Sequence, residues 1–217
     1  APVEQAEIGP TTQLAQYQRG GEELLALQLD FGTGWLVYDR ITKMLHTAPP
    51  NFSALDPVLV GGSAFMARNV NSTTYEAWVF SRSTGGFSQL ISRAPGHVIT
   101  VQADGQDLVW IETGPKTGPG TWPAGTLMRS PFTPVAAEVT GTLVRAMPAI
   151  PAPGLAIVGK GHFAILTSET NYLVVRLSDG RLWTVDVPSV NGSYLTDLSH
   201  MDETYVFYKT NTQIYRQ

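Results

Sequence analysis

Short apolar runs, each followed by a turn sequence and a second apolar run, recur along the whole chain. The clearest unit extends from Gly96 to Glu112, where the runs Val98–Val101 and Leu108–Ile111 flank Asp104-Gly105. An Asp-Gly pair readily adopts the positive φ of a hairpin turn, so this stretch predicts strand, turn and strand. The best helical candidate, Glu22–Gln28, is short. The pattern therefore predicts an all-β protein.

Four more units of the same kind have less regular sequences. They span residues 24–38, 57–66, 155–166 and 194–208. Further hairpins, around residues 83–86 and Asp179-Gly180, lie between the units and bring each repeat to about four strands. We take as equivalent one residue from each unit: Leu36, Phe65, Val109, Phe163 and Val206. Their separations are 29, 44, 54 and 43 residues.

The last three separations lie near the roughly 40–50-residue period of propeller blades. The separation of 54 contains the Gly/Pro-rich insertion Gly114–Pro123, which is incompatible with a helix or a regular strand. The separation of 29 is short. Either the first unit lacks a strand or Leu36 is not the equivalent residue.

Five units of roughly 43 residues fill the 217-residue chain, which predicts a β-propeller of about five four-stranded blades. Residues 1–21 are expected to form an N-terminal arm or a closing outer strand, and residues 22–217 the propeller repeats. A strand from the arm that joined the last blade would close the ring and remove exposed sheet edges. A partial propeller and a β-sandwich are the alternatives.

A family resemblance rests on Gly96-His97, Asp104-Gly105 and Leu108-Val109-Trp110, which resemble the first half of a WD40-type repeat. They are also similar to the degenerate repeats of bacterial extracytoplasmic propellers, and residues 179–183 carry the same pattern on a later hairpin. No unit ends in Trp-Asp, so the structural Asp of WD40 repeats has no counterpart in this chain. The resemblance implies the fold but no specific function, because propellers serve as scaffolds, lectins and enzymes.

The resemblance also implies an extracytoplasmic or secreted protein. The first residues, Ala-Pro-Val-Glu, are compatible with a mature chain after signal-peptide cleavage and equally with an arbitrary boundary. Asn51, Asn71 and Asn191 begin N-glycosylation sequons, a motif that also arises by chance in turn-rich chains.

Composition excludes several function classes. The net charge is −4 and the 14 basic residues are scattered, so binding along a nucleic-acid backbone is not expected. The chain has no cysteine, which removes disulfide and thiolate chemistry. No apolar stretch reaches the ~18 residues of a membrane span. No nucleophile elbow or phosphate loop is present, and we predict no cofactor.

Trp122 is the main candidate for ligand binding, because it lies in the insertion Gly114–Pro123, where no regular element is predicted to cover its ring. Loops on a rigid fold commonly bind ligands, and an exposed Trp can stack on a sugar ring or anchor a protein contact. With Lys116 and Thr121 beside it, Trp122 predicts a non-enzymatic module that binds a protein or a glycan. The alternative is that Trp122 folds back over a blade edge.

An enzymatic alternative rests on paired carboxylates, the usual catalytic groups of glycosidases. Asp39 and Glu112 each follow what is taken as the second strand of a unit, and Glu169 does so more loosely, so they are predicted to share one face. The simpler interpretation is a solvated strand end or a turn cap. A third possibility is a structural fragment of a larger surface protein that has no ligand of its own.

For the other aromatic residues and the histidines we predict structural roles. Trp35, Trp110 and Phe207 are expected to pack between blades, and Trp78 and Trp183 to pack on blade faces. His97 and His162 each follow a glycine at a strand start, where the ring is expected to bond to the turn backbone. No two of the four histidines have the spacing of a metal motif, so we assign no metal site; the four are His46, His97, His162 and His200.

Overall fold

A computed structural model of the chain describes residues 17–29, 34–49, 57–71, 74–91, 97–104, 106–116, 121–131, 141–150, 156–168, 170–186, 195–201, 206–210 and 214–216. All regular elements in these ranges are β-strands, and they form five antiparallel sheets that follow one another along the chain. No helix among the described residues could cross a membrane. The all-β prediction is confirmed.

Within each sheet the strands are neighbours in chain order. The first sheet contains β1 (Tyr17–Gly20), β2 (Leu24–Leu29), β3 (Gly34–Asp39) and β4 (Met44–Thr47). The second contains β5 (Val58–Val60), β6 (Ser63–Asn71), β7 (Thr74–Ser81) and β8 (Gly86–Ile91). The third contains β9 (His97–Ala103), β10 (Asp107–Thr113), β11 (Gly125–Pro131) and β12 (Thr142–Met147).

The fourth sheet contains β13 (Ala156–Gly159), β14 (His162–Leu166), β15 (Asn171–Arg176) and β16 (Leu182–Asp186). The fifth contains β17 (Leu195–Met201), β18 (Val206–Thr210) and β19 (Ile214–Arg216). Both clearest hairpin predictions, at Asp104-Gly105 and Asp179-Gly180, are therefore confirmed, since they join β9 to β10 and β15 to β16.

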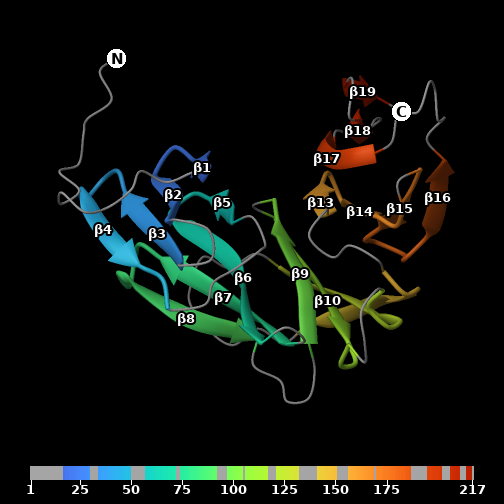
Figure 1. Cartoon of the computed structure of the whole chain (residues 1–217), viewed down its shortest axis with the longest axis horizontal. Coiled ribbons are helices and arrows are strands. Elements are labelled where there is room, and N and C mark those ends of the chain that lie inside the picture. Colours follow the sequence, from blue (N-terminus) through green and yellow to red (C-terminus); the bar gives the residue numbers. More distant parts are fainter. Residues whose placement is uncertain are drawn as a thin grey trace.

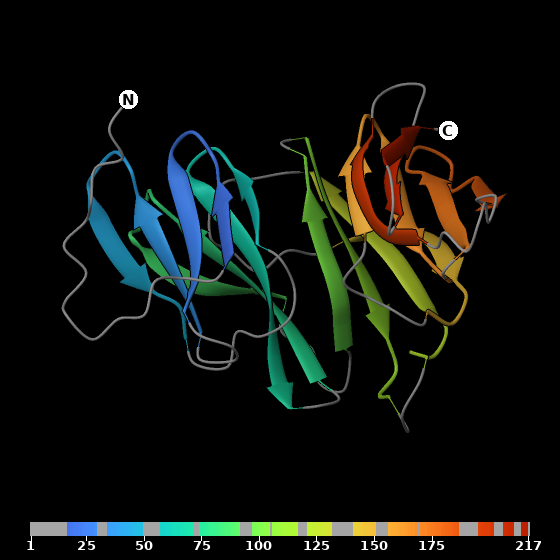
Figure 2. The same cartoon turned by 45° about the horizontal axis from the view of Figure 1, so that its top comes forward.

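The five sheets stand side by side along an open arc, with the first and fifth sheets at its two ends (Figures 1 and 2). The first strands of successive sheets, β5, β9, β13 and β17, contact one another along the arc. In the part of the chain that is described, no strand of the first sheet makes extended contact with the fifth. The arrangement is a partial propeller. The described end of the predicted arm, β1, pairs with β2 in the first sheet and not with the fifth sheet.

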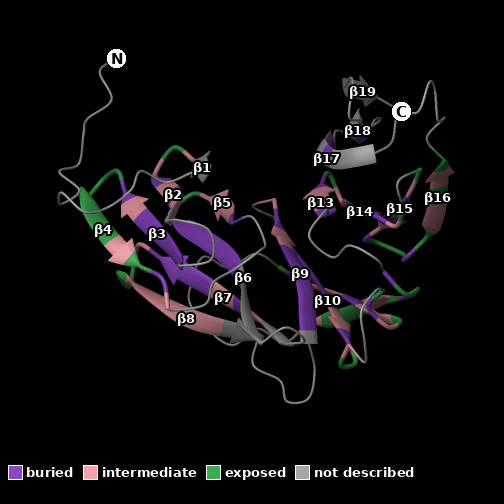
Figure 3. Cartoon of the chain, viewed as in Figure 1, coloured by how far each residue is buried: buried purple, intermediate pink, exposed green. Residues whose placement is uncertain are grey.

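Four apolar clusters hold the arc together, one at each contact between neighbouring sheets. The first joins β2 and β3 to β6 and β7, and the second joins β6 and β7 to β9 and β10. The third joins the third sheet to the fourth, and the fourth joins β14 and β15 to β17 and β18. The buried residues in Figure 3 follow these strands.

Successive residues of one strand belong to different clusters because side chains alternate between the two faces of a sheet. On β10, Leu108 and Trp110 pack toward the second sheet, whereas Val109 and Ile111 pack toward the fourth. On β14, Phe163 packs toward the third sheet. A strand that is buried on both faces has a continuous apolar run, which is why these segments stand out in the sequence.

Short connections gather at one edge of the arc, which we call the turn edge; they join β1 to β2, β3 to β4, β5 to β6, β7 to β8, β9 to β10, β13 to β14 and β15 to β16. Described positions with left-handed backbone cluster there, because tight hairpin turns need positive φ. They are Lys43, Gly61, Gly85, Lys160, Gly161 and Gly180, with φ between 51° and 74°. We call the opposite edge the loop edge; the insertion 114–123 lies there, after β10.

A backbone hydrogen bond ties the two turns of a sheet together at the turn edge. Arg40 N donates to Glu23 O at 2.9 Å in the first sheet, and Arg82 N donates to Gly62 O at 2.8 Å in the second. Leu177 N donates to Gly161 O at 2.8 Å in the fourth. Each bond extends the pairing of the second and third strands by one position, into the turns.

The short first separation in the repeat has a structural explanation. Leu36 lies on β3, the third strand of its sheet, whereas Phe65, Val109, Phe163 and Val206 lie on second strands. The equivalence that includes Leu36 is therefore wrong by one strand. Taking a residue on β2 such as Ala26 as the equivalent restores a separation of 39 residues from Phe65, close to one blade.

We expect Phe163→Ala to destabilise the fold by about 3–5 kcal/mol, because the ring is fully buried between the third and fourth sheets and its removal leaves a cavity. Chemical denaturation followed by tryptophan fluorescence would measure this. Ile41→Ala is the control, since Ile41 is 59% exposed and its truncation should change the free energy of unfolding little. Equal effects of the two substitutions would contradict the cluster assignment.

Candidate functional site

A pocket of about 670 Å³ opens at the turn edge between the third and fourth sheets. From the third sheet it is lined by residues around the start of β10 and the facing parts of β11 and β12, namely Gln106, Asp107, Arg129, Pro131, Thr142, Leu143 and Val144. From the fourth sheet it is lined by the β15–β16 turn, residues 177–180. Its volume lies within the range of small-ligand sites.

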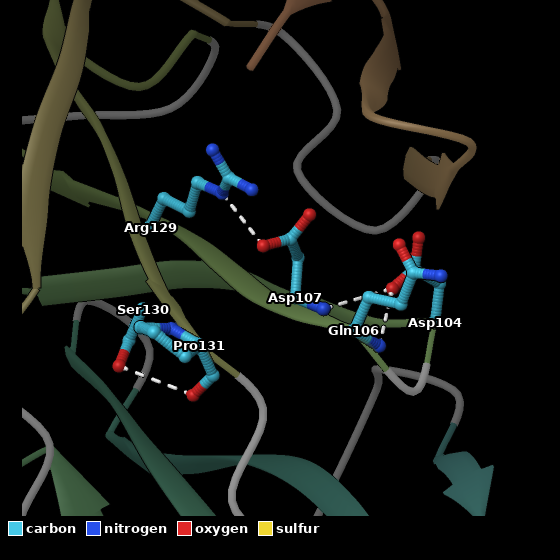
Figure 4. A network of polar contacts seen from close by, with 6 residues as sticks. All are labelled: Asp104, Gln106, Asp107, Arg129, Ser130 and Pro131. Atoms are coloured by element: carbon cyan, nitrogen blue, oxygen red, sulfur yellow. Dashed lines mark hydrogen bonds and ion pairs between the residues drawn. The ribbon is translucent and has the colours of Figure 1, made fainter. Parts of the chain in front are cut away.

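An ion pair forms the wall of this pocket on the third sheet. Arg129 Nε donates to Asp107 Oδ1 at 2.6 Å; the Asp107 side chain is 5% exposed and that of Arg129 is 39% exposed. Arg129 lies opposite Val109 and diagonal to Asp107 in the β10–β11 register, so both side chains project from one face of the sheet. Figure 4 shows the contact of Nε with Asp107 and one terminal nitrogen of Arg129 that points away from Asp107.

The hairpin turn before β10 positions Asp107. Asp104 Oδ1 accepts hydrogen bonds from Gln106 N and Asp107 N, both at 2.9 Å, as Figure 4 shows. This side-chain cap is an Asx-turn, which a short polar residue forms with the backbone two and three residues ahead. The turn therefore holds Asp107 at the first position of β10, and the buried carboxylate in turn orients Arg129.

The fourth sheet closes the pocket through a very close approach of two backbones. A Cβ on Gly180 would lie 2.6 Å from Val144 O, and its φ is +68°, so only glycine fits there. Arg145 Nη1 donates to Gly180 O at 2.8 Å and ties β12 to the same turn. Arg145 pairs with no carboxylate among the described residues, so it adds a positive charge beside the pocket.

A second ion pair lies on the rim of the pocket. Arg176 and Asp179 are joined by two hydrogen bonds, one of them Arg176 Nε to Asp179 Oδ1 at 2.9 Å. Hydrogen bonds from Arg176 and from Arg181 N hold the pKa of Asp179 well below its usual range. The guanidinium groups of Arg176 and Arg181 lie 5.7 and 5.1 Å from the centroid of the Trp183 ring. Trp183 therefore faces cations and is not an open stacking surface.

The described lining of the pocket contains no histidine and no cysteine, and its acidic residues are paired with arginines. The terminal nitrogens of Arg129 are pure donors, and the hydroxyls of Thr142 and Ser178 and the amide of Gln106 can both donate and accept. A guanidinium presents parallel N–H groups that match the two oxygens of a carboxylate. The geometry suits the binding of an anionic group and offers no pair for acid–base catalysis.

No family model and no curated protein matches the chain. Among solved structures it is similar to a prolyl endopeptidase, with a TM-score of 0.52 and 12% identity over 97% of this chain and 33% of that one. It is similar to the tricorn protease with a TM-score of 0.52 and 12% identity over 90% of this chain and 24% of that one. An apocarotenoid oxygenase variant from Synechocystis has a TM-score of 0.51 and 13% identity over 93% and 57%.

The fold is of the propeller type. The chain spans between a quarter and about three fifths of the length of these three structures. At such identities the likeness concerns the fold alone. The propeller part of the family resemblance is confirmed, while WD40 repeats in particular stay a prediction.

The structure changes the interpretation of Trp122. Its ring is 2% exposed and belongs to the apolar cluster between the third and fourth sheets. Its backbone pairs with Ile150 through bonds of 2.7 and 3.0 Å, and Lys116 Nζ lies 5.4 Å from the ring centroid. The structure shows the alternative in which Trp122 folds back and is covered, and not an exposed ring. Thr121 is exposed at the loop edge, and ligand contacts by Lys116 and Thr121 stay predictions.

The paired carboxylates lie at opposite edges of the arc. Asp39 ends β3, a third strand, and reaches the turn edge, whereas Glu112 lies near the end of β10, a second strand, at the loop edge. The prediction that they share a face is wrong because it took β3 for a second strand. Each carboxylate also has a structural partner: Asp39 Oδ1 caps the turn at Ile41 and Thr42, and Glu112 Oε1 accepts from Trp110 Nε1 at 2.9 Å.

Several other predictions can be located. Trp35 and Trp110 pack between sheets as expected, and His162 Nδ1 lies 3.1 Å from Lys160 O, a turn carbonyl. Trp78 packs against the first inter-sheet cluster. No group of three metal-ligating side chains occurs among the described residues. The remaining positions, or their side chains, lie outside the described part of the chain: Asn51, Asn71, Glu169, Asn191, His97, His200 and Phe207.

The sequence interpretation missed Asp107 and Arg129. A signal for Asp107 was present: a carboxylate directly between a turn and a two-sided apolar strand is out of place unless it has a partner. The partner itself could not be identified, because the register of β10 with β11 depends on how the long insertion between them folds.

Trp122→Ala should lower the free energy of unfolding by about 3–5 kcal/mol, as expected for removal of a buried aromatic ring. Thermal or urea unfolding would show this as an earlier transition. Thr121→Ala is the matched control in the same loop and should leave stability nearly unchanged, since Thr121 is exposed. A Trp122→Ala variant as stable as the wild type would contradict the burial of the ring.

Asp39 should make the fold sensitive to acid. Burial raises the pKa of Asp39, but hydrogen bonds from Thr42 and Ile41 outweigh burial and leave the pKa below its ordinary value. A carboxyl whose pKa is lower in the folded state stabilises the fold above the unfolded-state pKa, near about 3.9. This stabilisation is lost as the pH falls through the folded-state pKa.

The measurement is the free energy of unfolding between neutral pH and about pH 2. Asp39→Asn should reduce stability at neutral pH and flatten the decline in acid. Glu22→Gln, which alters an exposed carboxylate, should retain the wild-type decline. An unchanged acid profile in Asp39→Asn would show that the turn cap does not carry this effect.

Proposed function

We propose that the protein is a non-enzymatic binding module that holds an acidic segment of a partner protein at the pocket between the third and fourth sheets. Arg129 is the anchor of this proposal. The observation that supports it is that Arg129, which lines the pocket, donates to buried Asp107 through Nε alone, so Asp107 does not use the two terminal nitrogens of Arg129.

A pre-oriented guanidinium is a strong recognition group. Asp107 fixes the Arg129 side chain before a ligand arrives, so binding loses less side-chain entropy than it would at a free surface arginine. The two terminal nitrogens can bond both oxygens of a ligand carboxylate, and the hydroxyls of Thr142 and Ser178 can donate further bonds. The positive charge of Arg145 beside the pocket also favours the binding of an anionic group.

The rest of the pocket suits a polypeptide better than a glycan. Val144 and Leu177 contribute an aliphatic wall, and no aromatic ring is among the lining residues on which a sugar could stack. Arginine is enriched among the residues that dominate protein interfaces. An extracytoplasmic or secreted location is part of the same proposal, and it follows from the family resemblance alone.

An array of random peptides, probed with the purified protein, tests this function. We expect the bound peptides to be enriched in Asp and Glu, and replacement of the critical acid by its amide should weaken binding about tenfold or more, the loss of a charge-assisted bidentate contact. Rising salt concentration should weaken binding as well.

Arg129→Lys is the informative variant, because a lysine keeps a cation beside buried Asp107 but removes the fork of donors. It should abolish the preference for acidic peptides while the protein stays folded. Arg40→Lys, an exposed arginine at the turn edge of the first sheet, is the control and should bind as the wild type does. The proposal fails if no acidic preference exists or if Arg129→Lys retains it.

A further inference from the structure

A second pocket opens at the turn edge between the first and second sheets, with a volume of about 530 Å³. It lies on the same edge of the arc as the pocket with Arg129, two sheets away. Its described lining differs in kind, because every side chain that contributes to it is polar or charged. The contributing elements are the two turns of the first sheet and the two turns of the second.

An ion pair between the two sheets is the charged feature of this pocket. Arg82 Nη2 lies 2.7 Å from Glu23 Oε2, and the two side chains are 34% and 32% exposed, so both border the opening. No other charged residue is among its lining. Glu23 Oε2 is buried, and no aligned hydrogen bond reaches it among the described residues. The pair thus presents one positively and one negatively charged side chain at the opening.

Hydroxyl groups make up the rest of the polar surface. Thr42 and Ser83 are exposed at the pocket, whereas Ser63 and Ser81, which also line it, are buried; Ser81 Oγ and Ser83 Oγ lie 2.8 Å apart. A hydroxyl both donates and accepts, a guanidinium only donates, and a carboxylate only accepts. The lining therefore offers donors and acceptors close together, with two charged side chains of opposite sign; the Asp39 carboxylate, which also interacts with Arg82, is buried and does not line the pocket.

Gly62 sets the size of the opening. A Cβ at this position would lie 3.1 Å from both Arg82 Nε and Glu23 Oε2, the ends of flexible side chains. The backbone of Gly62 is not left-handed, so an alanine could adopt its conformation and would displace the ion pair into the pocket.

We propose that this pocket binds a neutral polyhydroxylated ligand, a sugar ring of hexose type. The hydroxyls of a sugar complement such a surface, because each can donate to Glu23 while it accepts from Arg82 or from exposed Ser83. A cation or an anion would be opposed by one member of the ion pair, and an apolar ligand would leave the polar groups unpaired. This proposal is independent of the peptide-binding function, which uses another pocket.

The test is a titration of ¹⁵N-labelled protein with methyl glycosides of neutral hexoses, followed by the amide resonances of residues 62, 63 and 81–83. We expect saturable shifts there, and no comparable shifts from cyclohexanol or from glucuronate. A glycan array probed in parallel separates the two sources of this chemistry, since hits would identify a sugar within a chain and a blank array a free sugar.

Gly62→Ala should weaken the hexoside affinity by about tenfold or more, equivalent to loss of a hydrogen bond or more at the site. Gly86→Ala is the matched control in the neighbouring hairpin, because a Cβ there meets nothing within 4 Å. Ser83→Ala is a second variant at an exposed position, where folding is not at risk, and it should weaken binding in the same direction. Acidic-peptide binding should be unchanged in all three variants.

The absence of saturable shifts with every hexoside would overturn the proposal. So would equal affinity in the wild type, Gly62→Ala and Ser83→Ala, or binding of cyclohexanol as tight as that of the hexosides. None of these results would bear on Arg129, whose pocket is tested by peptides.

Discussion

Packing of sheet against sheet is the interaction on which this molecule depends. A sheet that stands between two others must be apolar on both faces, so consecutive residues of one strand belong to different clusters, as Trp110 and Ile111 do. The requirement is met in the middle of each strand, where water is excluded. It is relaxed at the strand ends, and the polar residues that form both pockets are found there. The two pockets therefore lie where the apolar clusters between the sheets end.

Much of the fold could be predicted from the sequence because its signals are local. Asp104-Gly105 and Asp179-Gly180 predict hairpins because an Asp-Gly pair readily adopts a turn conformation, and the strands on either side of each pair are joined in the sheets. The blade count followed from the period of the apolar runs. The same signal misassigned Leu36, because β2 and β3 are both apolar and a two-sided strand does not reveal its order within a sheet. That error placed Asp39 at the wrong edge.

The candidate sites could not be predicted because their partners are distant in sequence. Arg129 meets Asp107 through the register of two strands separated by a long insertion, and Arg82 meets Glu23 across two different sheets. Trp122 shows the converse: a Gly/Pro-rich setting suggested an exposed ring, yet bonds to Ile150 fold the segment onto the core. A Gly/Pro-rich composition indicates that a loop has no regular secondary structure, but it does not indicate that the side chains of the loop are exposed.

The open arc has a consequence for how the molecule holds its shape. In a closed ring, each sheet is confined by all the others, whereas here the inner sheets have two neighbours and the end sheets one among the described residues. Such an assembly behaves as a linear array governed by nearest-neighbour terms. The curvature of the arc can then change at one contact at a time. A small change of the angle between two neighbouring sheets alters the pocket at that contact and leaves the next contact unaltered. The two pockets lie at different contacts between sheets, so each can change its width independently of the other.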